Sequence, residues 1–163
     1  MANDIRELKV KTNENLLKFK LIDEEGNDTG EYLTFDLEDM NCALRYQEMI
    51  EEHRKNAEYL KNQQVIISKQ EDHKGKKLLS SNEEKMQKAL AEYFDREIKA
   101  LDLVLGEGKT RLILKIMGRN PYLSMFEDIN EMLEPITPYI EKSYENIKQK
   151  IVGKYKDEPN ILE

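Results

Sequence analysis

Apolar and polar residues follow two different periods along the chain, and the first is a period of two. Apolar residues alternate with polar ones in two short runs; those that share a face are Leu17, Phe19 and Leu21, then Leu33 and Phe35. This alternation is typical of half-buried strands, and the segment between Glu25 and Gly30 is rich in residues that close turns. We therefore predict a β-hairpin over residues 16–35. A lone hairpin is marginally stable in water, so its apolar face must pack on helices or join a partner's sheet.

After the hairpin the period changes to that of a helix. Asp36 has a side chain suited to an N-cap, and Glu38 and Asp39 would interact favourably with the helix dipole in the first turn. We therefore expect a helix over residues 37–68. From residue 51 to residue 64 most side chains are charged or amides, which is typical of a helix that lies partly in solvent.

A second long helix follows a polar linker over residues 71–82. Ser81 or Asn82 is expected to cap this helix, and Glu84 would complete a capping box with Ser81. Its apolar residues recur at helical spacing; they are Met86, Leu90, Tyr93, Phe94, Ile98, Leu101 and Leu105. Because a short connection joins two helices of similar length, we expect them to pack antiparallel as a helical hairpin.

Glycine and proline divide the rest of the chain into shorter helices. The pattern predicts a helix over residues 109–117 that ends at Gly118, and a further helix with Asn120 as its N-cap and Pro121 as its first residue. The apolar stripe of that further helix consists of Tyr122, Met125, Phe126, Ile129, Met132 and Leu133. Two prolines separate it from a last helix, whose stripe consists of Ile140, Tyr144, Ile147 and Ile151.

These elements predict a mainly α (α+β) protein with an N-terminal β-hairpin, a long antiparallel helical hairpin and shorter C-terminal helices. We expect a single domain over residues 1–163, in which residues 37–155 are helical and both tails are flexible. The first fifteen residues are polar and weakly patterned, which predicts a mobile segment or a short strand. The pattern leaves open whether Leu162 and Glu163 belong to the native sequence.

Composition narrows the classes of partner. Charged residues make up 36% of the chain, the formal net charge is -7 and the isoelectric point is near 5.1. This acidic balance argues against nucleic acid, because phosphate binding needs a clustered basic surface. No apolar run approaches the length of a membrane span, so we expect a cytoplasmic protein without a membrane partner. Cys42 is the only cysteine, which excludes an intramolecular disulfide and a cysteine-based zinc cage.

One segment, GEGKT at residues 106–110, resembles a chemical motif. A phosphate-binding loop of the Walker type needs its first glycine at the position that Leu103 occupies, and a strand rather than a helix before it. We therefore interpret Gly106 as a helix-ending glycine in left-handed conformation, and Gly108 as a residue that loosens the turn into the next helix.

No other set of residues indicates catalysis. Glu51, Glu52 and His53 lack the H-E-x-x-H spacing of a metalloprotease helix, and we interpret them as a solvated face. His53 and His73 both lie in polar segments that we expect to be exposed, and neither has a nucleophile beside it in the sequence. No pair of carboxylates is placed for acid–base work. The sequence thus predicts a non-enzymatic protein with no catalytic residue, no cofactor and no metal site.

Two stretches of the chain resemble small tail assembly chaperones of long-tailed, siphovirus-like bacteriophages and related prophages. They are LKFKLIDEEGNDTGEYLTFDLED with the following LRYQEMIEEHRKN, and LDLVLGEG with GRNPYLSMFEDINEMLEPI. The resemblance implies a chaperone that binds the tape-measure protein and helps to recruit tail-tube subunits. It also implies action in the cytoplasm of the bacterial host and absence from the mature virion. In some of these phages a translational frameshift adds a C-terminal extension, and the sequence leaves open whether that happens here.

One apolar stripe is the candidate for protein binding. Its residues are Tyr122, Met125, Phe126, Ile129 and Met132. They would form a client-facing or self-association surface through helix-in-groove contacts, and the alternative is that they belong to an ordinary core. A second hypothesis for the whole protein is a small dimeric helical protein of phage origin, structural or regulatory, that dimerises through its helical hairpin. A discrete dimer that binds no client would favour this second hypothesis.

Overall fold

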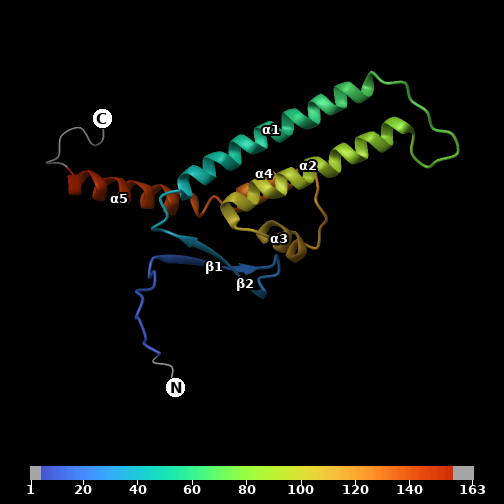
Figure 1. The fold of residues 1–163 in the computed structure, drawn as a ribbon. Helices are drawn as coiled ribbons and strands as arrows, with labels where there is room; N and C mark the ends of the chain where they lie inside the picture. The colour runs from blue at the N-terminus through green and yellow to red at the C-terminus, as the bar shows by residue number, and fades with distance from the viewer. Residues whose placement is uncertain (1–4, 156–163) are drawn as a thin grey trace.

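The computed structural model describes residues 5–155 of the chain, which form two strands followed by five helices (Figure 1). The elements are β1 (Leu16–Ile22), β2 (Asp28–Asp36), α1 (Cys42–Ser68), α2 (Ser81–Leu105), α3 (Lys109–Met117), α4 (Met125–Met132) and α5 (Thr137–Tyr155). This order confirms the predicted α+β class, with an N-terminal β-hairpin before a long helical hairpin and shorter helices. Leu162 and Glu163 lie outside the described residues.

The two strands pair antiparallel, as their alternation predicts. Leu17 lies opposite Phe35 and Phe19 lies opposite Leu33, so the apolar residues share one face. Leu33 and Phe35 are buried, and the rings of Phe19 and Phe35 form an edge-to-face pair with 5.9 Å between centroids. The helices therefore cover the apolar face of the hairpin, which a two-stranded sheet needs for stability in water.

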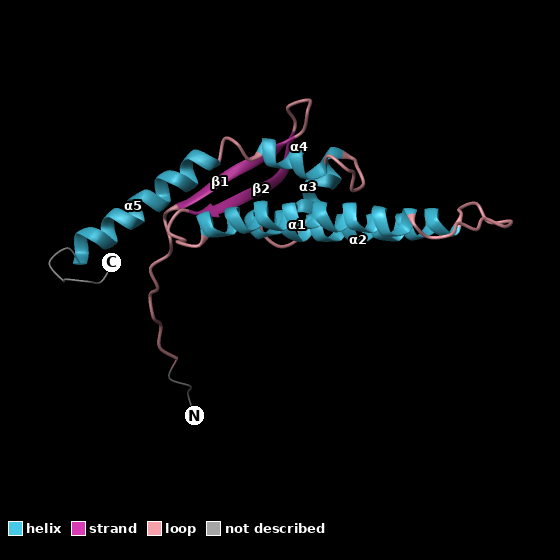
Figure 2. Ribbon diagram, turned by 90° about the horizontal axis from the view of Figure 1, so that it is seen from above, coloured by secondary structure: helices cyan, strands magenta, loops and turns pink. Residues whose placement is uncertain are grey.

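The helices α1 and α2 lie side by side and antiparallel, and together they extend well beyond the other elements (Figures 1 and 2). The hydrophobic core lies at one end of this pair. Its buried residues are Leu33, Phe35, Met49, Ile98, Leu101, Leu105, Ile113, Leu114, Met125, Phe126, Ile129, Leu133, Ile136 and Ile140. We call residues 16–57 and 93–143, which surround this core, the body. We call residues 58–92, where the two helices project with their connecting loop, the helical arm.

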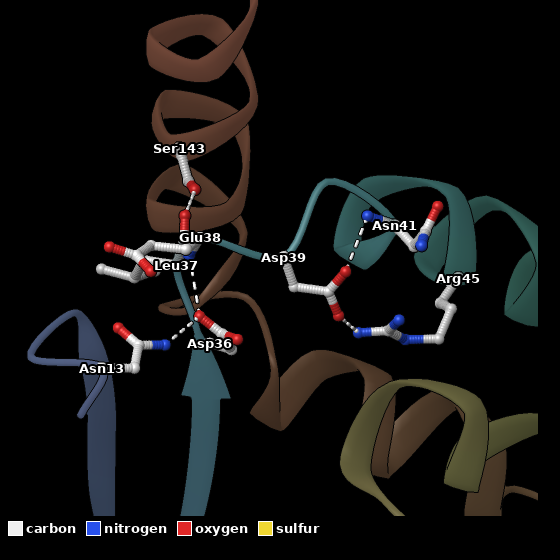
Figure 3. Close-up of polar contacts among 8 residues, drawn as sticks. All are labelled: Asn13, Asp36, Leu37, Glu38, Asp39, Asn41, Arg45 and Ser143. Atoms are coloured by element: carbon white, nitrogen blue, oxygen red, sulfur yellow. Dashed lines mark hydrogen bonds and ion pairs between the residues drawn. The ribbon is translucent and has the colours of Figure 1, made fainter. Parts of the chain in front are cut away.

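The predicted start of α1 is wrong by five residues. The helix begins at Cys42, and the Asp36 side chain does not cap it. Instead, Asp36 ends β2, and its Oδ1 accepts hydrogen bonds from the Glu38 backbone N–H at 2.9 Å and from the Asn13 side-chain amide at 2.6 Å (Figure 3). Short acidic side chains close turns in this way by bonding the backbone two residues ahead, and such turns compete with helix starts.

The predicted capping box of α2 is displaced by one residue. Ser80, not Ser81 or Asn82, is the N-cap, and its side chain accepts from the backbone N–H of Glu83 at 3.1 Å. Glu83 bonds back to the Ser80 N–H, so it takes the place that we predict for Glu84. The next residues tie down the preceding loop: Ser81 Oγ accepts from the His73 N–H at 3.1 Å.

The predicted bounds of the short helices are correct for α3 but not for α4, and one of the glycines that connect the helices is predicted wrongly. α3 has the predicted bounds, and Gly118 ends it in left-handed conformation with φ 67°. The prediction for Gly106 is wrong: its φ is 104° but its ψ of 156° is extended, and the left-handed glycine of that turn is Gly108, with φ 78°. α4 begins at Met125 instead of Pro121, because a turn precedes it in which the Met125 N–H bonds the Tyr122 carbonyl at 3.0 Å.

A ring contact and a hydrogen bond join the last helix, α5, to the body near the start of the helix. Ile140 is buried, the Tyr139 ring lies against Phe19, and the Ser143 hydroxyl donates to the Leu37 carbonyl at the end of β2 (Figure 3). From there α5 leads away from the body, at the end of the sheet opposite to the turn between β1 and β2 (Figures 1 and 2). Its second half therefore extends beyond the sheet, although Ile147 still borders a hollow lined by Leu37 and Glu38.

Candidate functional site

An apolar groove of about 480 Å³ lies between the β1–β2 turn and the helices α3 and α4. Its apolar lining consists of Leu21, Ile22, Ile113, Ile116, Met117 and Met132, and its charged rim of Asp23, Glu24, Glu25 and Arg119. We call it the turn groove. Three of its apolar side chains face solvent to a large extent: Ile22 is 60% exposed, Met117 40% and Met132 41%. Ile113, by contrast, is buried and anchors the groove to the core.

The acidic side of the turn groove is held by a closed turn. Asp23 Oδ1 accepts from the backbone N–H of Glu25 at 3.0 Å and from that of Asn27 at 2.8 Å. The strand pairing is also irregular between Lys20 and Ile22, just before this turn. The turn geometry therefore depends on local hydrogen bonds, and it places three carboxylates in sequence at one rim of the groove.

The opposite wall of the groove, α3, is positioned by a single carboxylate. Asp102 Oδ2 accepts from the Gly108 N–H at 3.0 Å, while its Oδ1 accepts from the Thr110 N–H at 3.0 Å and from the Thr110 hydroxyl at 2.6 Å. Asp102 thus satisfies free N–H groups at the start of α3, where Gly108 has no side chain to do so. In the GEGKT segment, Thr110 is fully buried and its hydroxyl bonds Asp102, which supports the interpretation of this segment as a helix connection.

The five residues of the predicted binding stripe separate into two groups. Met125, Phe126 and Ile129 are 1%, 3% and 1% exposed and belong to the core, as the alternative interpretation holds. Met132 lines the turn groove. Tyr122 is half-buried beside it: the Arg119 guanidinium lies 3.6 Å from the centre of its ring, and its hydroxyl donates to Asp128 at 2.8 Å. Burial raises the pKa of Tyr122, and the hydrogen bond to Asp128 raises it further.

Sequence reasoning missed most of the groove lining. The strongest signal for it is in α3, where apolar side chains occupy more than one face; they are Leu112, Ile113, Leu114, Ile116 and Met117. A surface helix needs only one apolar face to pack on a core. The surplus face of α3, with Ile116 and Met117, forms the wall of the groove.

A second polar site, which the sequence does not predict, lies where α1, α2 and α4 meet. Glu97 is 1% exposed, and its carboxylate lies 2.6 Å from His53 Nδ1 and accepts from the Asn56 amide at 2.8 Å and from the Tyr93 hydroxyl at 3.3 Å. The imidazole of His53 stacks on Phe126 with 3.7 Å between ring centroids. We call this group the Glu97 cluster.

The Glu97 cluster corrects the interpretation of His53 as part of a solvated face. Its side chain is 23% exposed and packed between α2 and α4, with Nε2 3.6 Å from Glu127. Burial, with the Glu97 charge as the next cause, raises the pKa of Tyr93. A signal was present in the sequence: Glu97 lies four residues from both Tyr93 and Leu101, so it falls on the apolar stripe of α2. Buried carboxylates need partners, which these neighbours supply.

Among residues 5–155, no group of three or more His, Cys, Asp or Glu side chains is arranged to hold a metal ion. Cys42 is half-buried, and this burial raises the pKa of its thiol. None of the helices within these residues is both long enough and apolar enough to span a membrane. Comparisons of the chain with protein-family models, curated proteins and solved structures give no match.

Proposed function

We propose that the protein is a non-enzymatic tail assembly chaperone of a phage or prophage, which binds the tape-measure protein and helps to recruit tail-tube subunits. The observation that supports this proposal is the turn groove, where the apolar side chains of Ile22, Met117 and Met132 face solvent together. Grouped apolar side chains on a surface mark sites of protein binding more often than isolated ones do. The resemblance described above supplies the identity of the client. On this proposal the protein acts in the cytoplasm of the bacterial host and is absent from the mature virion.

The groove has the chemistry needed to hold a helical client segment. Apolar client side chains spaced three or four residues apart would bury against Ile22 and Ile116, on opposite walls. Met117 and Met132 would adapt to side chains of different shape, because the methionine side chain is unbranched and flexible. The exposed edges of the groove would keep the interaction reversible, which a chaperone that leaves the final assembly requires.

The proposal is tested by co-expression with the tape-measure protein encoded in the same phage. We expect the two proteins to co-purify, and the tape-measure protein to remain soluble when the chain is present. Met132→Glu places a charge in the groove and should reduce the recovered client about tenfold or more. Met40→Glu is the matched control, because Met40 is 50% exposed and does not line the groove. If the wild-type chain neither co-purifies with the client nor changes its solubility, the chaperone proposal is wrong.

The alternative function, a small dimeric structural or regulatory protein of phage origin, is supported by a different surface. On the helical arm, Val65 and Ile66 are 45% and 50% exposed on α1. A dimer formed through the arm would cover them. Light scattering over a concentration series separates the two proposals: a discrete dimer that binds no client favours this alternative.

A further inference from the structure

The second half of α5 carries an apolar stripe that the body covers only in part. Ile140 is 6% exposed and Ser143 donates to the Leu37 carbonyl, so the first turns are fixed (Figure 3). The same stripe continues with Ile147 and Ile151, which are both half-buried, and Ile147 borders a hollow that it shares with Leu37 and Glu38. This part of α5 projects away from the body (Figure 1), so nothing in the described chain covers the stripe fully.

Lysines flank this stripe on both sides. The segment from Asn146 to Tyr155 contains Lys148, Lys150 and Lys154 and no acidic residue. At the helical angle of about 100° per residue, Lys148 and Lys150 lie on opposite sides of the line through Ile147 and Ile151. The projecting end of α5 is therefore a basic amphipathic helix on a protein whose formal net charge is -7.

The turn groove has the complementary chemistry. Its apolar lining is bordered by Asp23, Glu24 and Glu25, three consecutive carboxylates. The one cation of its rim, Arg119, already lies over the Tyr122 ring. An apolar stripe flanked by lysines fits such a groove: the stripe would bury against the lining while the lysines reach the acidic turn.

The position of α5 in the fold shows that an α5 docked in the turn groove must come from a second copy of the chain. The β1–β2 turn and the C-terminal half of α5 lie at opposite ends of the sheet (Figures 1 and 2), so the groove is out of reach of the α5 of its own chain. We propose that the second half of α5 of one copy docks in the turn groove of another copy, so that the chain associates head to tail. This inference does not rest on the proposed function, because association of the purified chain is measured without the client, although α5 and the client would compete for the same groove.

The kind of association follows from this geometry. In a head-to-tail pair one groove and one α5 remain unoccupied, so further copies can add. The weight-average mass should therefore rise with concentration past twice the chain mass of 19.3 kDa, without a plateau at the dimer. The contact is small and partly ionic, so the association should be weak and should decrease with added salt.

Two variants of the full chain test the proposal by sedimentation and light scattering. Ile151→Asp places a charge in the apolar stripe of the second half of α5, and Met132→Glu places a charge in the turn groove. Each variant alone should remain at 19.3 kDa at concentrations where the wild type associates. An equimolar mixture should form a heterodimer of twice that mass and nothing larger, because one copy keeps an intact groove and the other an intact α5.

Further variants control for misfolding and for charge. Lys148→Glu with Lys150→Glu should reduce association like Ile151→Asp, although both lysines are exposed and leave the core untouched. Val65→Asp on the helical arm should leave association unchanged. The proposal is overturned if the wild type stays monomeric, if it stops at a dimer, or if the mixture of the two variants does not pair. A monomeric chain that binds vesicles of anionic lipid through α5 would assign this helix to a lipid surface and would also overturn it.

Discussion

The body and the helical arm are built from the same two helices but are stabilised in different ways. In the body, α1 and α2 pack against the sheet, α3, α4 and the start of α5, and fourteen buried residues form one core. In the arm the two helices contact each other, and the buried apolar residues are Ile67 and Ala89, outside that core. A long helix is therefore not equally stable along its length, because its stability depends on what packs beside each turn.

Polar contacts do not compensate for the thin packing of the helical arm. Its ion pairs, such as Lys88 with Glu84, join side chains that are largely exposed to solvent. Exposed pairs of this kind contribute little, because water and salt screen them. We therefore expect the arm to open locally at a lower free energy than the body, with faster amide hydrogen exchange.

The largest difference in stability is expected between two matched substitutions, one of a buried isoleucine in the body and one of a buried isoleucine in the arm. Ile129→Ala leaves a cavity in the core and should lower the free energy of unfolding by about 3–4 kcal/mol. Ile67→Ala removes the same atoms from the arm, where the site is open on more sides, and should cost about 1–2 kcal/mol. Denaturation with urea, followed by circular dichroism, measures both. Equal losses would show that the arm is packed as tightly as the body.

An intermediate effect is expected at the Glu97 cluster, where the arm leaves the body. Glu97→Ala leaves His53, Asn56 and Tyr93 without their buried hydrogen-bond partner, and should cost about 3 kcal/mol. Glu97→Gln keeps the shape and one acceptor oxygen, so it should cost less. Thermal unfolding measures the two losses. Glu92→Ala is the control on the exposed face of α2, and a loss there as large as at Glu97 would contradict a special role of the cluster.

The smallest expected effect lies at the ion pair between Asp39 and Arg45, at the start of α1. Arg45 lowers the pKa of Asp39 below its ordinary value of 3.8, so the folded protein binds fewer protons here than the unfolded chain. The stabilisation is complete above that ordinary value and is lost as the pH falls through the folded pKa. With both side chains partly exposed, Asp39→Asn should cost about 0.5–1 kcal/mol at pH 7.

Measuring the unfolding free energy at several pH values tests whether the Asp39 charge stabilises the fold. The difference in unfolding free energy between wild type and Asp39→Asn should shrink as the pH is lowered from 5 to about 3. A difference that stays constant over this range would show that the Asp39 charge does not stabilise the fold.

Periodicity predicted the elements well because apolar patterns report directly on burial. The alternation of Leu17, Phe19, Leu33 and Phe35 predicted the hairpin and its paired face, and glycine at residue 118 predicted the end of α3. Starts of helices were predicted less well. Asp36, Ser81 and Asn120 have suitable side chains, but several neighbouring residues do too, and tertiary contacts decide which of them caps a helix.

The candidate site was the hardest part to predict, because it combines distant segments. Of the predicted stripe, Met132 lines the turn groove together with Ile22 of β1 and Met117 of α3. A pattern on one helix predicts which residues share a face, but it does not predict which face remains uncovered after the helices have packed. The burial of His53 escapes prediction for the same reason, since its partners Glu97 and Phe126 lie far away in sequence.

Asp102 connects the helix junction to the width of the turn groove. Its carboxylate holds the first turn of α3 by three hydrogen bonds, to Gly108 and Thr110, while Ile116 and Met117 at the far end of the same helix form the groove wall. A small change of angle at the first turn would be magnified over the length of α3 into a displacement of that wall. Asp102 thus sets the orientation of α3. Substitutions at Asp102 would change the width of the turn groove, and so the size of the side chains that fit into it, without changing any residue that lines it.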